Sequence, residues 1–136
     1  MAKKILIIDD SFLIRSGLEG AFKKSENWDT VVLAEDGKKG LEKIESEKPD
    51  VVLMDIEMPE MDGITALKEI GKKKRSGEIP KDLPIVILSG TMYENDENIR
   101  KAKMLGAADV LAKPEGKSST LSVNIQELEE RLKKVL

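Results

Sequence analysis

The sequence contains no cysteine and no histidine, and each absence removes a class of chemistry. Without cysteine there can be no disulfide, no zinc thiolate site and no thiol nucleophile. Without histidine the chain lacks the commonest general base in proteins. Any metal ion must therefore be bound by oxygen atoms.

Long apolar runs are also missing. No stretch approaches the roughly 20 apolar residues that a membrane span needs, and residues 1–30 do not have the pattern of a cleavable export signal. We therefore expect a cytoplasmic protein that does not contact the membrane. The net charge of −3 does not favour direct binding to nucleic acid. At 136 residues the chain is long enough for one domain. We therefore expect residues 1–136 to form a single domain, with no additional output domain or DNA-binding domain.

Short, continuous, β-branched apolar runs are the clearest local pattern. Three of them, Ile5–Ile8, Val51–Met54 and Ile85–Leu88, are typical of strands buried on both faces of a parallel sheet. Val31–Ala34 and Ala107–Ala112 are weaker examples of the same pattern. The sequence therefore predicts five strands.

Between these strands, apolar residues recur at intervals of three or four, as on the buried side of a helix. The stripes lie within Ile14–Phe22, Leu41–Ile44, Ile64–Ile70, Ile99–Leu105 and Ile125–Val135. Asn124 and Glu127 are suitable capping residues for the last helix. Five alternations of strand and helix predict a doubly wound α/β fold with a parallel sheet, whose ligand site lies beyond the carboxyl ends of the central strands.

Two stretches have the composition of surface connections, Gly71–Asp82 and Glu115–Ser122. The first contains four consecutive cations, Lys72–Arg75. Such a run is typical of a solvated helix end, where positive charge suits the helix dipole.

The residues at the ends of the predicted strands carry the chemistry. Asp9 and Asp10 follow the first strand, Asp55 the third, Ser89 the fourth and Lys113 the fifth. The fold is expected to bring all five side chains together. Carboxylates in such a cluster repel one another by about 4 kcal/mol per close pair at an intermediate dielectric, so the cluster needs a cation or a proton. Oxygen ligands on open turns favour Mg2+.

Lys113 would supply a fixed positive charge to this cluster, and the hydroxyl of Ser89 could donate a hydrogen bond to a phosphoryl oxygen. Transfer of a phosphoryl group to a carboxylate demands mainly positioning and charge neutralisation. Each residue alone also has an ordinary structural explanation: Asp10 as a helix cap, Ser89 as a loop start and Lys113 as an exposed side chain before a turn. Because these residues occur together at matching positions in the fold, the combination indicates a functional site more specifically than any one of them does.

Four segments resemble the bacterial response-regulator receiver domain, a CheY-like family. They are Ile7–Ser11, Leu53–Gly63, Ile87–Ser89 and Gly106–Pro114. The resemblance covers nearly the whole chain and implies a flavodoxin-like (βα)5 fold with strand order 2-1-3-4-5. It is strongest to the receiver half of chemotaxis methylesterases. The chain has no Gly-x-Ser-x-Gly motif and no histidine, so it is not expected to be an esterase, or any enzyme beyond catalysing its own phosphoryl transfer and dephosphorylation.

The resemblance also implies a role for each candidate residue. Asp55 corresponds to the phosphoacceptor, and Asp10, Asp55 and the backbone carbonyl of Glu57 to direct Mg2+ ligands. Asp9 corresponds to a residue that holds the metal through water. Ser89 and Lys113 correspond to the switch hydroxyl and the phosphate-binding lysine, and a cis Lys113–Pro114 bond is expected.

The partners that the resemblance implies are a sensor histidine kinase and an unknown output protein. The output protein would bind the face formed by the fourth helix, the fifth strand and the fifth helix. The receiver would be a monomer or a phosphorylation-dependent dimer. Phosphorylation at Asp55 would shift this face toward its partner-binding state.

One switch position departs from the family pattern. Where the family usually has Tyr or Phe, three residues before Lys113, this chain has Val110. Valine cannot transmit a signal by ring rotation, so the coupling would depend on the backbone from Ser89 to Tyr93. An alternative hypothesis is a constitutive interaction module that keeps the fold without being switched. An Mg2+ phosphatase is a weaker alternative, because the first strand lacks an Asp-x-Asp motif.

Overall fold

The computed structural model describes residues 3–58, 61–89, 97–112, 115–117, 120–122 and 125–136. Five parallel strands form one sheet in the order β2-β1-β3-β4-β5, as predicted. The strands are β1 (Lys4–Ile8), β2 (Thr30–Ala34), β3 (Val51–Asp55), β4 (Ile85–Ser89) and β5 (Asp109–Ala112). Each predicted run lies in one of these strands, but β1 and β2 begin one residue earlier than predicted, at Lys4 and Thr30, and Ala107 and Ala108 precede β5. Asp55 and Ser89 are the last residues of their strands and do not follow them.

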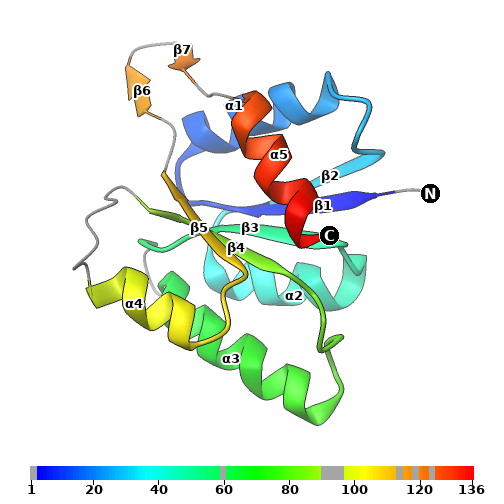
Figure 1. Ribbon diagram of the computed structural model, residues 1–136, viewed down its shortest axis with the longest axis vertical. Helices are drawn as coiled ribbons and strands as arrows, with labels where there is room; N and C mark the ends of the chain where they lie inside the picture. The colour runs from blue at the N-terminus through cyan, green and yellow to red at the C-terminus, as the bar shows by residue number, and fades with distance from the viewer. Residues whose placement is uncertain (1–2, 59–60, 90–96, 113–114, 118–119, 123–124) are drawn as a thin grey trace.

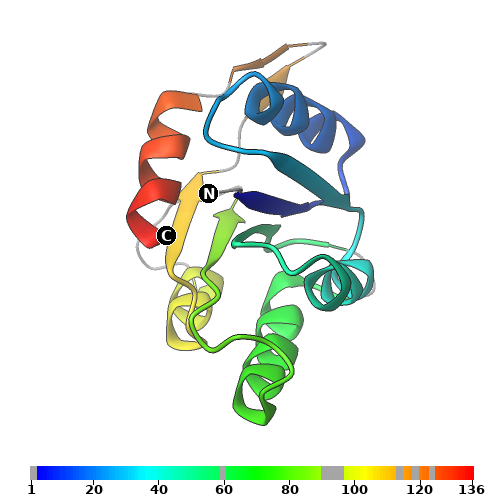
Figure 2. The ribbon, with the colours of Figure 1, turned by 90° about the vertical axis from the view of Figure 1, so that its right-hand side faces the viewer.

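Five helices cover the sheet in two layers (Figures 1 and 2). The helices are α1 (Phe12–Lys23), α2 (Gly37–Glu47), α3 (Gly63–Ser76), α4 (Glu97–Met104) and α5 (Ile125–Val135). One layer consists of α1 and α5, and the other of α2, α3 and α4. The central strands are therefore buried on both faces, which explains their continuous apolar sequences.

Alternating side chains of each strand contribute to two separate hydrophobic cores. In β1, Leu6 and Ile8 pack in the core beneath α2, α3 and α4, whereas Ile5 and Ile7 pack in the core beneath α1 and α5. This alternation follows from the two-residue period of a strand. Because both cores use the same strands, the strand ends hold fixed positions at the carboxyl edge of the sheet.

Three helices begin at side-chain caps at this carboxyl edge. The side chains of Ser11, Asp36 and Asp62 accept hydrogen bonds from the first-turn backbone N–H groups of α1, α2 and α3. Short polar side chains are preferred at these positions because helix N-termini leave N–H groups without partners. Asp36 and Asp62 are thus capping residues, while Asp9 and Asp10 come before the cap of α1. The proposed cap Asn124 lies outside the described residues.

Both predicted surface connections contain regular structure. The segment Gly71–Ser76 continues α3, which ends at Gly77 with φ of 86°. Lysine and arginine favour helix, so the cationic run extends α3 in spite of Gly71. Within Glu115–Ser122, the strands β6 (Glu115–Lys117) and β7 (Thr120–Ser122) form an antiparallel pair, of which β7 lies against α1. Strands of three residues are too short for their side-chain pattern to reveal them.

The described residues include no helix that is both long and apolar enough to cross a membrane.

A small ionic cluster joins α2 to the end of α3. Because of it, the stability of the protein should depend on pH. Lys73 Nζ lies 2.8 Å from Glu45 and 3.1 Å from Glu78. The hydrogen bond that Lys73 donates to Glu78 lowers the pKa of the exposed Glu78 carboxyl. Because the pKa is lower in the folded state, Glu78 contributes stability above its unfolded pKa, and this contribution is lost as the pH falls.

We therefore expect Glu78→Gln to lower the urea midpoint slightly at neutral pH, and this effect to shrink as acid protonates the Glu78 carboxyl. Glu130→Gln, an exposed change on α5, is the control. An equal effect of Glu78→Gln at neutral and acid pH would contradict this assignment.

Candidate functional site

Three carboxylates meet where β1 and β3 reach the carboxyl edge of the sheet. One oxygen from each of Asp9, Asp10 and Asp55 lies within 4.8 Å of the others. Asp9 and Asp55 are buried, with exposed fractions of 0% and 1%, whereas Asp10 is exposed. The predicted acidic cluster is therefore present, and it opens to solvent through Asp10.

Asp9 is fixed through both its backbone and its side chain. Its N–H donates to the carbonyl of Ala34 at the end of β2, and its Oδ1 accepts from the N–H of Ser11 at 2.8 Å. Its carbonyl oxygen accepts a hydrogen bond of 2.6 Å from Nη1 of Arg15 in α1. The end of β1 is thus tied to the neighbouring strand and to the helix that follows it.

Asp55 ends the central strand of the sheet. Its Oδ1 accepts a hydrogen bond of 3.2 Å from the N–H of Glu57, and the next residue, Ile56, is bonded to Leu88 of β4. The N–H of Gly63 donates to the carbonyl of Ile56 at 2.8 Å, so α3 begins directly against this loop. The backbone around Asp55 is therefore held from two sides.

Ser89 lies at the same edge of the sheet. It ends β4, is 4% exposed, and follows Leu88, which is the register partner of Asp55. Its own partner in β5 is Ala112, the residue before Lys113. Lys113 and the Lys113–Pro114 bond, expected to be cis, lie outside the described residues.

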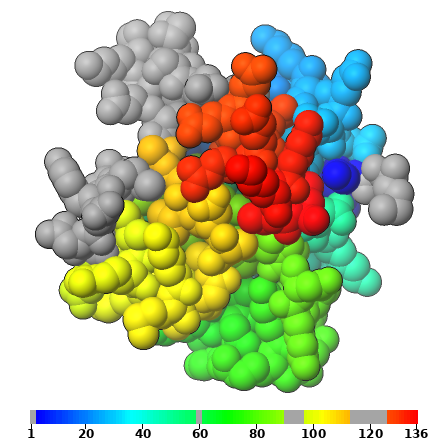
Figure 3. Space-filling model, viewed as in Figure 1, coloured from blue at the N-terminus to red at the C-terminus, as the bar shows by residue number. Residues whose placement is uncertain are grey.

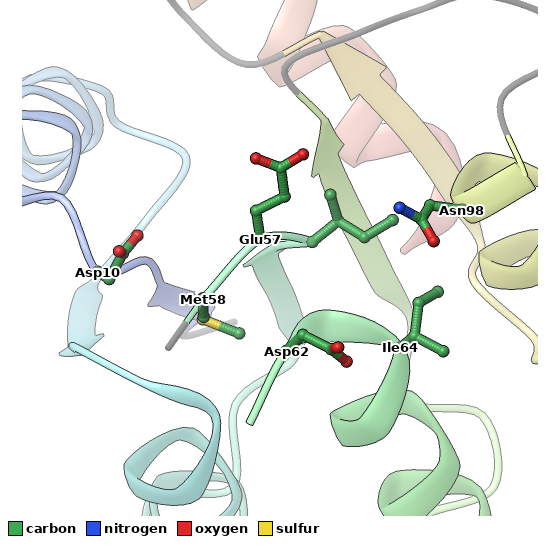
Figure 4. Close-up of a pocket in the computed structure, with 7 residues that line it drawn as sticks. Asp10, Glu57, Met58, Asp62, Ile64 and Asn98 are labelled. Carbon is green, nitrogen blue, oxygen red and sulfur yellow. The ribbon is translucent and has the colours of Figure 1, made fainter. Parts of the chain in front are cut away.

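A pocket of about 540 Å³ opens beside the carboxylates (Figure 4). It is lined by Asp10, Ile56, Glu57, Met58, Asp62, Ile64 and Asn98. The Glu57 side chain is exposed, and the pocket extends from Asp10 past Glu57 to the beginnings of α3 and α4. The sequence interpretation did not assign site roles to Ile64 and Asn98, because they lie in or next to predicted helical segments rather than at strand ends.

The donor set suits a small, hard divalent cation. All three clustered ligands are carboxylates, and a hard ion such as Mg2+ prefers oxygen and often uses one or two carboxylates together with water. Like unit charges 4 Å apart repel by about 4 kcal/mol at an effective dielectric of 20. A bound cation would offset this repulsion between the carboxylates. The exposed position of Asp10 leaves room for water molecules around such an ion. The residues present therefore fit Mg2+.

Val110, at the position where the family usually has an aromatic residue, is buried. It is 3% exposed, lies opposite Ile87 of β4, and packs in the core beneath α2, α3 and α4. Its neighbour Asp109 accepts a two-fold hydrogen bond from Arg131 of α5. β5 is therefore attached to α5 by an ion pair, next to the position where an aromatic ring was expected. Tyr93 lies outside the described residues.

The sequence and the fold were compared with known proteins. A family model described as the response regulator receiver domain matches residues 5–125. A protein-glutamate methylesterase/protein-glutamine glutaminase from Oleidesulfovibrio alaskensis is 38% identical over 129 residues, which cover 95% of this chain and 32% of the relative. The chain spans about a third of the length of several such curated relatives.

Two solved structures match nearly all of the chain. The response regulator domain of Thermotoga maritima CheB has 32% sequence identity and a TM-score of 0.78, with 99% of this chain and 94% of that chain covered. The chemotaxis protein CheY4 of Vibrio cholerae has 26% identity and a TM-score of 0.81, with both chains fully covered.

Proposed function

The chain belongs to the response regulator receiver domain family, and from this membership we propose that it is a phosphorylation switch of a two-component system with Asp55 as phosphoacceptor. The observation that carries the proposal is the cluster of Asp9, Asp10 and Asp55 at the carboxyl edge of the sheet. Asp55 ends the central strand, and its backbone is fixed by β4 and by the start of α3. A rigid carboxylate beside further carboxylates is suited to accept a phosphoryl group when a cation is present.

Each residue has one role in this proposal. Asp10, Asp55 and the carbonyl of Glu57 would bind Mg2+, with Asp9 holding it through water. The ion would offset the negative charge of the carboxylates and of the incoming phosphoryl group. Ser89 and Lys113 would bind phosphoryl oxygens, Ser89 as a hydrogen-bond donor and Lys113 as a positive charge.

In the transfer step, a carboxylate oxygen of Asp55 attacks the phosphorus atom of the donor. The new O–P bond forms as the bond from phosphorus to the donor's leaving atom breaks, and the leaving group keeps that electron pair. The chain has no histidine of its own, so a phosphohistidine donor would have to be supplied by a partner. A sensor histidine kinase in the cytoplasm is the partner that we propose.

The output partner is proposed to bind the surface of α4, β5 and α5. These segments lie next to one another on one face of the molecule (Figure 3). β5 connects this face to the site, because Ala112 is the register partner of Ser89 and Asp109 is bonded to Arg131 of α5. A change at Ser89 could thus reach α5 through the backbone of β5, without the aromatic ring that Val110 replaces.

The direct test is phosphorylation by a small acyl phosphate in the presence of Mg2+. Intact-protein mass spectrometry should show the addition of one phosphoryl group to the wild-type protein, and removal of Mg2+ by EDTA should abolish the addition. Asp55→Asn should not be labelled, because an amide oxygen is a poor nucleophile. Beryllofluoride should shift amide NMR signals of the wild-type protein and leave those of Asp55→Asn unchanged.

Asp36→Asn is a matched control for this experiment. Asp36 also lies at the carboxyl edge of the sheet, but its Oδ1 caps α2 by accepting from the N–H of Lys39 at 2.8 Å. Asparagine caps helices about as well as aspartate, so labelling should persist in this variant. An unlabelled wild-type protein, or equal labelling of Asp55→Asn, would refute the proposed function.

A constitutive interaction module is the second candidate, and Val110 is the observation that favours it. In that case the protein would bind its partner with the same affinity with and without beryllofluoride. A pull-down under both conditions distinguishes the two candidates, because the switch requires a difference.

A further inference from the structure

Arg15 is the one described side chain that bridges α1 and the backbone between Asp9 and Asp10. Its Nη1 donates to the Asp9 carbonyl at 2.6 Å, and its side chain is half-buried. The guanidinium carbon lies 6.0 Å from the ring centroid of Phe12 on the same helix, within the range of a cation–π contact. Arg15 is thus fixed at two points close to the acidic cluster, although it belongs to neither the sheet nor the cluster.

The bond to the Asp9 carbonyl acts on Asp10. The carbonyl of Asp9 and the N–H of Asp10 belong to one planar peptide unit. A donor that fixes the carbonyl oxygen therefore also fixes the orientation of this peptide plane, to which Cα of Asp10 is attached. A hydrogen bond from a charged donor contributes about 1.5–3 kcal/mol, which is enough to favour one orientation of this peptide. Arg15 therefore restricts the direction in which the Asp10 side chain can point.

The orientation of the Asp10 side chain depends on this peptide more than that of the Asp9 side chain does. The Asp9 side chain is buried and accepts from the N–H of Ser11. The Asp10 side chain is exposed, and within the described part of the chain its carboxylate accepts no hydrogen bond. Its position relative to Asp55 depends mainly on its own backbone.

We propose that Arg15 is a positioning residue for Mg2+ binding, acting through the Asp9–Asp10 peptide on the Asp10 carboxylate. The inference rests on the proposed function, because it requires that the cluster binds Mg2+. It makes Arg15 part of the site, although sequence patterns placed it on an ordinary helix. Partners of metal ligands typically alter metal affinity by tenfold or more when they are removed.

Removal of Arg15 would change the affinity for Mg2+ in opposite directions, depending on whether Arg15 acts through its charge or by positioning Asp10. A nearby guanidinium repels Mg2+, so if Arg15 acted only through its charge, removing it would strengthen Mg2+ binding. If it acts by orienting the peptide, removing it weakens binding. The sign of the change thus identifies the mechanism.

The test compares Arg15→Met and Arg15→Lys with the wild-type protein by isothermal titration calorimetry with Mg2+ alone. Methionine keeps much of the side-chain volume but removes the charge and the donor, and should weaken Mg2+ binding by about tenfold. Lysine keeps the charge and one donor without the planar guanidinium, and should weaken binding by a smaller factor. Unfolding in EDTA is measured in parallel, because a purely structural role would change stability and leave the affinity of the folded protein unchanged.

Arg75→Met, an exposed change near the end of α3, is the matched control and should bind Mg2+ as the wild type does. Unchanged or tighter binding by Arg15→Met would overturn the inference while leaving the proposed function intact. If Arg15→Met does not fold, wild-type affinity in Arg15→Lys would overturn it instead. A wild-type protein that does not bind Mg2+ would refute the proposed function and this inference together.

Discussion

Replacing Gly63 with alanine is expected to destabilise the protein by about 2 kcal/mol and to weaken both Mg2+ binding and phosphorylation. Gly63 is the first residue of α3, and a Cβ atom there would lie 2.7 Å from the carbonyl oxygen of Asp55 and 2.7 Å from Cα of Ile56. Both atoms belong to the backbone, so no side-chain rotation can relieve the overlap. The start of α3 and the backbone from the end of β3 to Glu57 must therefore move apart.

Gly20→Ala is the matched control for this prediction. A Cβ atom at Gly20, an exposed position in α1, would meet no atom within 4 Å. Alanine should stabilise this helix by about 0.8 kcal/mol and leave the site unchanged. Urea unfolding and calorimetry with Mg2+ would measure both variants. Equal stability of the two variants would show that α3 does not depend on close contact with the backbone of Asp55 and Ile56.

Replacing Asp10 with asparagine is expected to change stability in opposite directions without and with Mg2+. Without the ion, the substitution removes repulsion between Asp10 and the two buried carboxylates. This should raise the free energy of unfolding by about 1 kcal/mol, a value reduced because Asp10 is exposed. With the ion at about 100 times its dissociation constant, the wild-type protein should gain about 2.7 kcal/mol, most of which the variant should lose.

Thermal unfolding in EDTA and in excess Mg2+ tests this expectation for the wild type, Asp10→Asn and Asp36→Asn. Asp36→Asn should respond to Mg2+ as the wild type does, because Asp36 caps α2. If Asp10→Asn gained as much stability from Mg2+ as the wild type, Asp10 would not be a ligand.

The fold could be predicted from the sequence because its main signals are local. The buried strands of a doubly covered sheet need continuous apolar runs, and Ile5–Ile8, Val51–Met54 and Ile85–Leu88 are such runs. The acidic cluster could be predicted for a related reason. Once β1 and β3 are parallel neighbours, Asp9 and Asp55 must lie at the same edge.

Other features depend on contacts that no local pattern reveals. The pairing of β6 with β7 involves three residues in each strand, too few to show a period. Arg15 looks like any cation on an amphipathic helix, and only the folded chain brings its guanidinium to the Asp9 carbonyl. The Asp109–Arg131 ion pair joins residues 22 positions apart and is equally invisible in the sequence.

Under the proposed function, the uneven burial of the carboxylates at the site bears on how a phosphoryl donor would approach Asp55. Asp55 is 1% exposed and ends the central strand of the sheet, whereas Asp10 and Glu57 are exposed and border the open pocket. If Asp55 is the phosphoacceptor, as we propose, a phosphoryl donor would approach it past Asp10 and Glu57, the exposed residues that border this pocket. The water molecule that later hydrolyses the phosphoryl group would use the same opening. A partner that covers the opening would then slow the arrival of the signal and its decay together, and so set how long the signal lasts.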